Sequence, residues 1–229
     1  MKKKDIIFRD TISLRGPSIW TYPPVIETWI DIGELEDFPS DKIPGLYERL
    51  SAWLPGLVEH RCNYGEHGGF LRRLKEGTWS GHILEHIVLE LMTLAGLPDG
   101  FGRTRETTTR GVYKLVVSNF HTEVTRMALD VGRELLPAAI DDEPHDEAVR
   151  LLRRKVDRKY LGPSTAAIVL AGEKRGIPHI RLLDDGNLVQ LGYGAAMRRI
   201  WTAETDQTSA IAETISRDKD LTKELISSV

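Results

Sequence analysis

An apolar segment near the middle of the chain, GHILEHIVLEL at residues 81–91, carries two histidines and two glutamates. At about 100° per helical residue, the four polar side chains fall on one arc of roughly 140°, which holds His82, Glu85, His86 and Glu90. Imidazoles at positions i and i+4 stand one turn apart, a spacing at which both can bind one Zn²⁺. The pattern H-x-x-E-H matches the inverzincin arrangement, in which the glutamate is the general base toward a zinc-activated water. The segment therefore predicts a zinc-binding helix with ligands His82 and His86 and base Glu85.

A catalytic zinc site needs a third protein ligand from elsewhere in the chain. Glu123 is preferred, because it belongs to a separate predicted helix that could pack alongside. Glu90 is the alternative, but three ligands on one straight helix would strain a tetrahedral site. We therefore assign Glu90 to orienting an imidazole N–H, and His121 is a further candidate ligand. In the competing interpretation, the same histidines and glutamates form a hydrogen-bonded structural network without a metal.

A second group of metal-binding residue types occurs in HRCNYGEH, residues 60–67. The spacing of His60, Cys62 and His67 fits no closed Cys/His zinc pattern, although His67 could line the cleft. Cys62 is the only cysteine of the chain. An internal disulfide is therefore excluded, which favours a reducing cytoplasm.

The composition excludes several classes of function. The 229 residues carry a net charge of -3, so no bulk electrostatic attraction to nucleic acid is indicated. No apolar run approaches the roughly 18 residues of a membrane span. The lysines at the N-terminus are not followed by an apolar stretch, so we expect no signal peptide. The expected protein is cytoplasmic and binds neither membrane nor nucleic acid.

The residue patterns indicate an α/β (α+β) fold. Strands are expected at residues 3–14 and 24–33, and an antiparallel pair at 103–120, because these segments are rich in β-branched residues. Helices are expected at 43–57, 68–77, 81–95 and 121–140, the last ending at Pro137 or a little after. We expect these strands to form a small mixed sheet, backed by the helices at 81–95 and 120–136.

Three parts of the chain are distinguished. Residues 1–142 form the predicted N-terminal domain, and the acidic, proline-containing segment 141–149 marks its end. Residues 143–160 are predicted to form a basic linker helix. Residues 161–229 show a helix, a strand, a tight Asp-Gly-Asn turn, a second strand and two short helices. This last part is expected to be a smaller, incomplete α/β segment.

Several long strings resemble the N-terminal region of cyanophycin synthetase. They are LRGPSIW (14–20), GGFLRRLKEGTWSGHILEHIVLEL (68–91), AGLPDGFGRTRET (95–107) and GVYKLVV (111–117). Further on, LVQLGYGAAMRRIWTAETDQTS (188–209) is similar to the segment that leads into the ATP-grasp module of that family. The resemblance covers almost the whole chain.

The resemblance implies a large cytoplasmic enzyme, usually a homo-oligomer, that makes a polymer of aspartate with arginine on each side chain. Its ATP-grasp module adds aspartate and its Mur-ligase-like module adds arginine, each with ATP and Mg²⁺. The N-terminal domain of the family holds the polymer. In some members it also cuts the polymer into primers at a metal-dependent site, which His82, Glu85 and His86 match.

Arginines near the predicted site could bind the carboxylates of such a polymer. Arg103 and Arg105 could fork onto carboxylates, or pair at the surface with Glu106. Arg72 and Arg73 could serve the same end, or belong to a solvated helix face.

The chain stops at Val229 without a glycine-rich phosphate loop or the magnesium-binding carboxylates of a ligase. The residues alone are therefore not expected to ligate anything, as in an excised fragment or a truncated paralogue. The expected function is cyanophycin binding with zinc-dependent cleavage of the polymer. A non-catalytic polymer-anchoring scaffold is the alternative, and a nucleotide-binding fragment is a third hypothesis.

Overall fold

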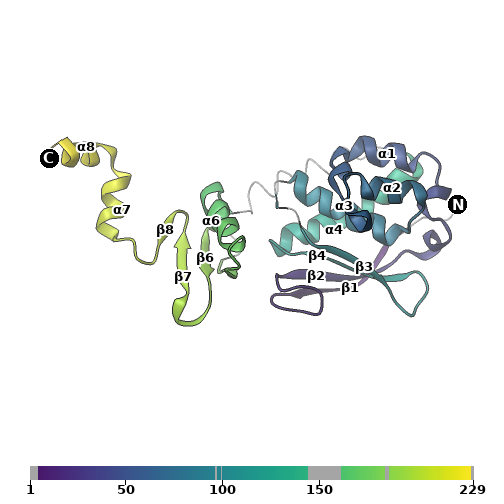
Figure 1. Ribbon diagram of the computed structural model, residues 1–229, viewed down its shortest axis with the longest axis horizontal. Coiled ribbons are helices and arrows are strands. Elements are labelled where there is room, and N and C mark those ends of the chain that lie inside the picture. The colour runs from purple at the N-terminus through teal and green to yellow at the C-terminus, as the bar shows by residue number, and fades with distance from the viewer. Residues whose placement is uncertain (1–4, 96, 99, 144–160, 184–185, 228–229) are drawn as a thin grey trace. The chain divides into compact units, whose positions relative to one another are not determined.

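The computed structural model describes residues 5–95, 97–98, 100–143, 161–183 and 186–227 (Figure 1). The chain divides into two compact units, Met1–Arg158 and Lys159–Val229. Almost all of the predicted linker helix, residues 144–160, lies outside the described residues. Within the described part, no helix is both long and apolar enough to cross a membrane.

The first unit contains a four-stranded sheet in the order β1-β2-β4-β3. Its strands are β1 (Ile7–Leu14), β2 (Val25–Asp31), β3 (Gly102–Glu106) and β4 (Val112–Ser118). The mixed α/β fold class is confirmed, but every neighbouring pair is antiparallel, so the predicted mixed sheet is wrong in this detail. The strand order follows from composition, because β2 and β4 are buried along most of their length and take the centre. The more exposed β1 and β3 form the edges.

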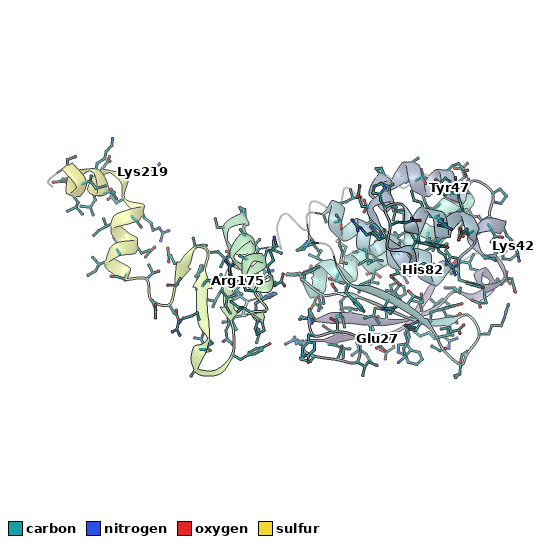
Figure 2. The ribbon with its side chains drawn as sticks, in the orientation of Figure 1. Glu27, Lys42, Tyr47, His82, Arg175 and Lys219 are labelled. Atoms are coloured by element: carbon teal, nitrogen blue, oxygen red, sulfur yellow. The ribbon has the colours of Figure 1, made fainter. Side chains whose placement is uncertain are left out.

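Helices cover one face of this sheet (Figure 1). The long ones are α3 (Ser80–Leu94) and α4 (Thr122–Asp141), and the short ones are α1 (Leu46–Trp53) and α2 (Gly69–Glu76). As expected, α4 ends a little after Pro137. Short 3₁₀ turns lie between these elements, namely η1 (Gly33–Asp37), η2 (Ser40–Lys42), η3 (Pro55–Glu59) and η4 (Cys62–Tyr64). Figure 2 shows His82 within the helical layer and Glu27 on the sheet.

The apolar side of α3 forms the centre of the core. Leu84, Ile87 and Val88 have no exposed surface, and all three approach Gly132 of α4. A Cβ atom at Gly132 would lie 3.0 Å from Val88 and 3.1 Å from Leu84. The missing side chain therefore lets α4 pack closely against the side of α3 that is opposite to its polar arc.

The second unit holds its own antiparallel sheet, in the order β5-β6-β7-β8. The described elements of the second unit are α6 (Pro163–Glu173), β5 (His179–Arg181), β6 (Leu188–Leu191), η5 (Gly194–Ala196), β7 (Arg198–Trp201), β8 (Glu204–Thr205), α7 (Ala210–Arg217) and α8 (Lys219–Ser227). Val169, Val189 and Ile200 form a small core. The predicted helix, two strands and two terminal helices are confirmed, whereas β7 and β8 were not predicted. Asp185, the first residue of the predicted Asp-Gly-Asn turn, lies outside the described residues.

Candidate metal centre

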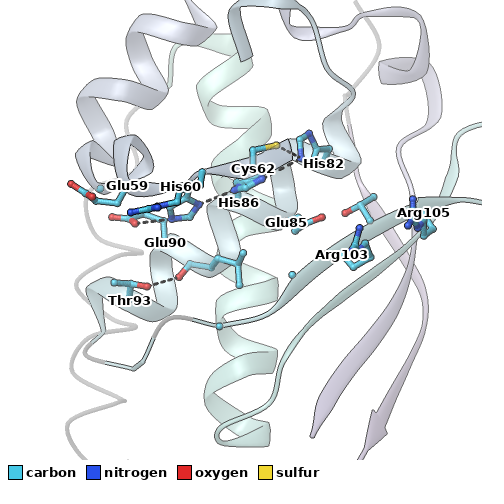
Figure 3. A pocket seen from close by; sticks show the side chains of 16 residues that line it. Glu59, His60, Cys62, His82, Glu85, His86, Glu90, Thr93, Arg103 and Arg105 are labelled. Carbon is cyan, nitrogen blue, oxygen red and sulfur yellow. Dashed lines mark hydrogen bonds and ion pairs between the residues drawn. The ribbon is translucent and has the colours of Figure 1, made fainter. Parts of the chain in front are cut away.

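A pocket of about 640 Å³ opens between α3, strand β3 and the segment that contains η3 and η4 (Figure 3). The α3 residues that line it include all four of the polar arc, His82, Glu85, His86 and Glu90, together with Leu89 and Thr93. The other walls are formed by Gly56, Glu59, His60, Arg61 and Cys62, and by Gly102, Arg103, Thr104 and Arg105. The arc that helical periodicity places on one side of α3 therefore faces a cavity.

Three potential metal ligands converge at one end of this pocket. The ligand atoms of Cys62, His82 and His86 all lie within 4.8 Å of one another. The Nε2 atoms of the two histidines are 3.2 Å apart, and Cys62 Sγ lies 3.5 Å from His82 Nε2. Thiolate and imidazole ligands together suit a zinc ion, and three protein ligands leave a fourth position for water or substrate.

Local backbone features bring Cys62 to the histidines. Cys62 has φ +46°, in the left-handed region that a residue with a side chain seldom adopts. The segment is pinned by close packing of α2, because a Cβ atom at Gly69 would overlap the carbonyl oxygen of Arg61. Next to Gly69, the Phe70 ring stacks on His86 with ring centroids 4.0 Å apart. Cys62 is therefore held in place by the first turn of α2.

The imidazole nitrogens that face away from Cys62 have their own partners. His82 Nδ1 lies 2.9 Å from Thr78 Oγ1, and His86 Nδ1 lies 2.8 Å from His60 Nδ1. His60 Nε2 in turn lies 3.3 Å from the Glu90 carboxylate. Both rings are therefore fixed from behind, with Nε2 turned toward the thiol.

Burial determines the charge of the two histidines. It lowers the pKa of His82 to about 4 and that of His86 to about 2. At neutral pH both rings are therefore uncharged, which is the form that binds a metal.

Glu85 lines the same pocket, one turn from His82. Burial raises the pKa of its carboxyl to about 7, while the Thr104 hydroxyl and the charge of Arg103 oppose the rise. Gly102 leaves room for this side chain, because a Cβ atom there would lie 2.9 Å from Glu85 Oε1. The carboxyl thus lies between α3 and β3, in the direction of Arg103 (Figure 3).

The structure does not bring Glu123 to the histidines. Glu123 is exposed in the first turn of α4 and does not line the pocket. The reason is that α4 packs on the apolar side of α3, as the contacts of Gly132 show. His121 is buried at the N-cap of α4, where its ring accepts a hydrogen bond from the Val124 N–H. Among the described residues, the side chain that lies beside the two histidines is that of Cys62 and not that of Glu123.

The alternative ligand, Glu90, lines the pocket with 2% of its surface exposed. It does not belong to the group formed by Cys62, His82 and His86. Its carboxylate bonds to His60, so it contacts an imidazole as the sequence analysis assigned, although this imidazole is not one of the predicted ligands.

The arginines divide into two pairs. Arg103 and Arg105 line the pocket. Arg72 is exposed on α2, where it pairs with Glu66 at 3.2 Å and Glu76 at 2.9 Å, as on a solvated helix face. Neither Arg72 nor Arg73 is among the lining residues, although the charge of Arg73 contributes to lowering the pKa of His82.

Sequence reasoning missed the contribution of HRCNYGEH to the pocket. His60 and Cys62 both line it, whereas His67 is exposed and contacts Glu59. Motif spacing could not find them, because Cys62 and His82 are 20 positions apart in two different elements. The available signal was the co-occurrence of a lone cysteine and a histidine ahead of the glycine pair at Gly68 and Gly69.

Comparison with known proteins identifies the class of domain to which this pocket belongs. A family model described as the cyanophycin synthase-like N-terminal domain matches residues 27–141, which include α3, β3 and Cys62. The chain belongs to this family.

Curated relatives match most of the chain. It is 41% identical over 221 residues to the cyanophycin synthetase of Trichormus variabilis, and the match covers 93% of this chain and 24% of the relative. Identity is 42% over 220 residues with the cyanophycin synthetase of Geminocystis herdmanii, covering 93% and 25%. With that of Synechocystis it is 38% over 223 residues, covering 94% and 25%. The chain thus spans about a quarter of the length of these relatives.

Proposed function

We propose that the first unit binds cyanophycin and cleaves its peptide backbone by zinc-dependent hydrolysis, which supplies primers for synthesis of the polymer. The observation that carries this proposal is the convergence of Cys62 Sγ and the Nε2 atoms of His82 and His86 at one end of a pocket. The cyanophycin synthetases among the relatives support the choice of polymer.

The donor atoms fit a zinc ion. Cys62, His82 and His86 would hold it, because both imidazoles have partners at Nδ1 and turn Nε2 toward the thiol. A bound Zn²⁺ would supply Lewis-acid polarisation of the peptide carbonyl and a water nucleophile of lowered pKa.

Glu85 is the group we assign to proton transfer. Its carboxyl lines the pocket on the same helical arc as the two histidines, at a position where it can take a proton from an attacking water and deliver it to the leaving amine. Thr104 and Arg103 lower the pKa of this carboxyl against the effect of burial, so both favour its ionised form.

Arg103 and Arg105 are assigned to the carboxylates of the polymer. Both lie on the edge strand β3 and line the pocket, where a guanidinium can form paired hydrogen bonds with a carboxylate. Arg72 and Arg73 lie outside the pocket lining and could contact the polymer only further from the site of cleavage.

We extend the proposal to a whole protein of which this chain forms the N-terminal part. That protein would be a cytoplasmic amide ligase and homo-oligomer, with ATP-grasp and Mur-ligase-like modules that use ATP and Mg²⁺. The names of the relatives support the ligase.

Metal analysis and a cleavage assay on the purified chain test the proposed hydrolase. We expect bound zinc and release of short chains from cyanophycin. Glu85→Gln should retain zinc and lose about 10²–10⁴-fold in cleavage rate, the usual contribution of a general base.

Glu59→Gln is the matched control, because Glu59 also lines the pocket but 73% of its side chain is exposed. It should cleave as the parent does. A parent protein that binds no zinc and cleaves nothing would leave only a polymer-anchoring module, and a Glu85→Gln variant that cleaves normally would refute the assignment of the base.

A further inference from the structure

A line of buried polar contacts extends behind the candidate ligand His86. His86 Nδ1 lies 2.8 Å from His60 Nδ1, and His60 Nε2 lies 3.3 Å from Glu90 Oε2. Glu90 is 2% exposed, His86 is 5% exposed, and the His60 side chain is 13% exposed. The three side chains form a row of contacts that is almost closed to solvent. The row ends at the candidate metal centre (Figure 3).

Packing fixes both ends of this row of contacts. The Phe70 ring stacks on His86 and lies 6.3 Å from the His60 ring. Glu90 lies directly against the backbone of η3, because a Cβ atom at Gly56 would overlap its carboxylate. His60 itself is anchored through its carbonyl, which accepts a hydrogen bond of 2.9 Å from the Phe70 N–H. This packing holds His86, His60 and Glu90 in one geometry. A fixed placement of protons along their hydrogen bonds requires such a geometry.

The donor and acceptor roles of His86, His60 and Glu90 follow from the requirement that Nε2 of His86 be free to bind a metal. A neutral His86 that presents the lone pair of Nε2 must carry its proton on Nδ1, and that proton can be donated only to His60 Nδ1. His60 Nδ1 is then an acceptor, so the His60 ring carries a proton on Nε2. From Nε2 it is donated to the Glu90 carboxylate. One arrangement of protons satisfies both contacts and leaves Nε2 of His86 free.

We infer that His60 and Glu90 are positioning residues that hold His86 as the Nδ1–H tautomer, with Nε2 free to bind the metal. A carboxylate bonded to a ligating imidazole orients the ring and raises its basicity. Here the carboxylate acts through a second imidazole. This inference rests on the proposed metal centre but assigns residues that lie outside its ligand group.

The other histidine provides an internal comparison. His82 Nδ1 contacts the hydroxyl of Thr78 at 2.9 Å, and Thr78 is almost fully buried. A hydroxyl can either accept or donate, so it does not impose one tautomer as a carboxylate does. The tautomer of His86 is therefore more strictly determined than that of His82.

Long-range ¹⁵N–¹H spectra of histidine-labelled, metal-free chain at pH 7.5 test the tautomer directly. The parent should show His86 as the Nδ1–H form. His60→Phe should shift His86 toward the Nε2–H form and should weaken zinc binding about 10–100-fold in a chelator competition. His60→Gln, whose side-chain oxygen can still accept from His86 Nδ1–H, should recover part of the affinity and of the tautomer. Glu90→Gln should fall between His60→Phe and the parent.

The exposed pair His67 and Glu59, with Nε2 3.2 Å from Oε1, supplies matched controls from the same segment. His67→Phe and Glu59→Gln should leave both the tautomer and the zinc affinity unchanged. If His60→Phe does not fold, His60→Gln and Glu90→Gln carry the test.

An unchanged His86 tautomer in His60→Phe or, if that variant does not fold, in both His60→Gln and Glu90→Gln would overturn the inference, even if zinc binds. If the parent chain binds no zinc but His60→Phe still shifts the His86 tautomer, the proposed hydrolase would be overturned. The positioning of His86 by His60 and Glu90 would still stand.

Discussion

At the scale of single residues, Cys62 depends most on its surroundings. Its φ of +46° costs conformational energy, and the packing of Gly69 against Arg61 holds the segment in place. The strained backbone turns the thiol toward His82. Such strain at a position that carries a potential ligand is consistent with a site that is shaped before a metal arrives.

Replacing Cys62 with serine should therefore weaken zinc binding more than the loss of His60 does. We expect a decrease of more than about 100-fold, beyond the range for residues that only support a ligand. The backbone strain is the same for serine, so the free energy of unfolding of the metal-free chain should change little. Chelator competition and urea unfolding measure the two quantities.

Glu123→Gln is the control for this prediction, because the sequence analysis preferred Glu123 as the third ligand. It should bind zinc as the parent does. Equal losses of affinity in the two variants would mean that the ligand group differs from the one formed by Cys62, His82 and His86.

Helical periodicity alone placed His82, Glu85, His86 and Glu90 on one side of α3, and the structure has all four in the pocket. The approach of Cys62 to the two histidines could not be found in this way, because it results from tertiary packing. The preference for Glu123 overlooked a signal on α3 itself. A partner helix must cover the apolar side of α3, and that side lies opposite to the histidines.

At the scale of elements, the contact between α2 and η4 positions Cys62 in the candidate metal centre. Gly69→Ala would force a methyl group into the carbonyl of Arg61. We expect a loss of about 1–3 kcal/mol in unfolding free energy, together with weaker zinc binding, because the segment that carries Cys62 must move. Urea unfolding and zinc titration test both effects.

Gly16→Ala is a suitable control, since a Cβ atom there would have no neighbour within 4 Å and φ is not positive. It should match the parent in both measurements. A Gly69→Ala variant with lower stability but full zinc affinity would show that α2 does not position Cys62.

The contact between η1 and β4 predicts a decline of stability at alkaline pH. Burial raises the pKa of Tyr113 above its ordinary value of 10, and its hydroxyl donates a 2.7 Å hydrogen bond to Glu36. The folded state therefore holds this proton more tightly than the unfolded state. Its stabilising effect is complete below pH 10 and is lost as the pH rises above 10.

The expected slope is less than ~1.4 kcal/mol per pH unit, because solvent screens part of the interaction. Tyr113→Phe should remove this extra slope in denaturant unfolding between pH 9 and about pH 11. Tyr22→Phe should not, because Tyr22 is 83% exposed. Identical pH profiles for the parent and Tyr113→Phe would contradict the prediction.

The elements themselves were largely predictable from the sequence. The strands and helices of the first unit follow β-branched runs and helical periodicity, and their order along the chain is confirmed. Their pairing was less accessible, because the order β1-β2-β4-β3 depends on which strands become buried on both faces. The short strands β7 and β8 lack a clear alternation in the sequence and were missed.

At the scale of the whole molecule, the two compact units should respond differently to mutation. The second unit has a core of three buried residues with a few partly buried neighbours, and α7 and α8 bury none of their residues. Ile200→Ala should therefore cost about 2–5 kcal/mol, enough to unfold a unit of this size.

Hydrogen exchange should show loss of protection in β5–β7 of this variant, while the first unit keeps its protection and the chain keeps its zinc affinity. Ile211→Ala should change neither unit, because Ile211 is 74% exposed. Loss of zinc binding in Ile200→Ala would show that the units are energetically coupled.

The separation of Cys62 from His82 along the chain has a consequence for proteolysis. A cation shared by these two residues would tie η4 to the start of α3 and close a loop of 20 positions that contains α2. Closing such a loop removes conformational freedom from the opened state. Trypsin should therefore cut after Arg61 more slowly in zinc-loaded chain than in chelator-treated chain, and Cys62→Ser should abolish that protection.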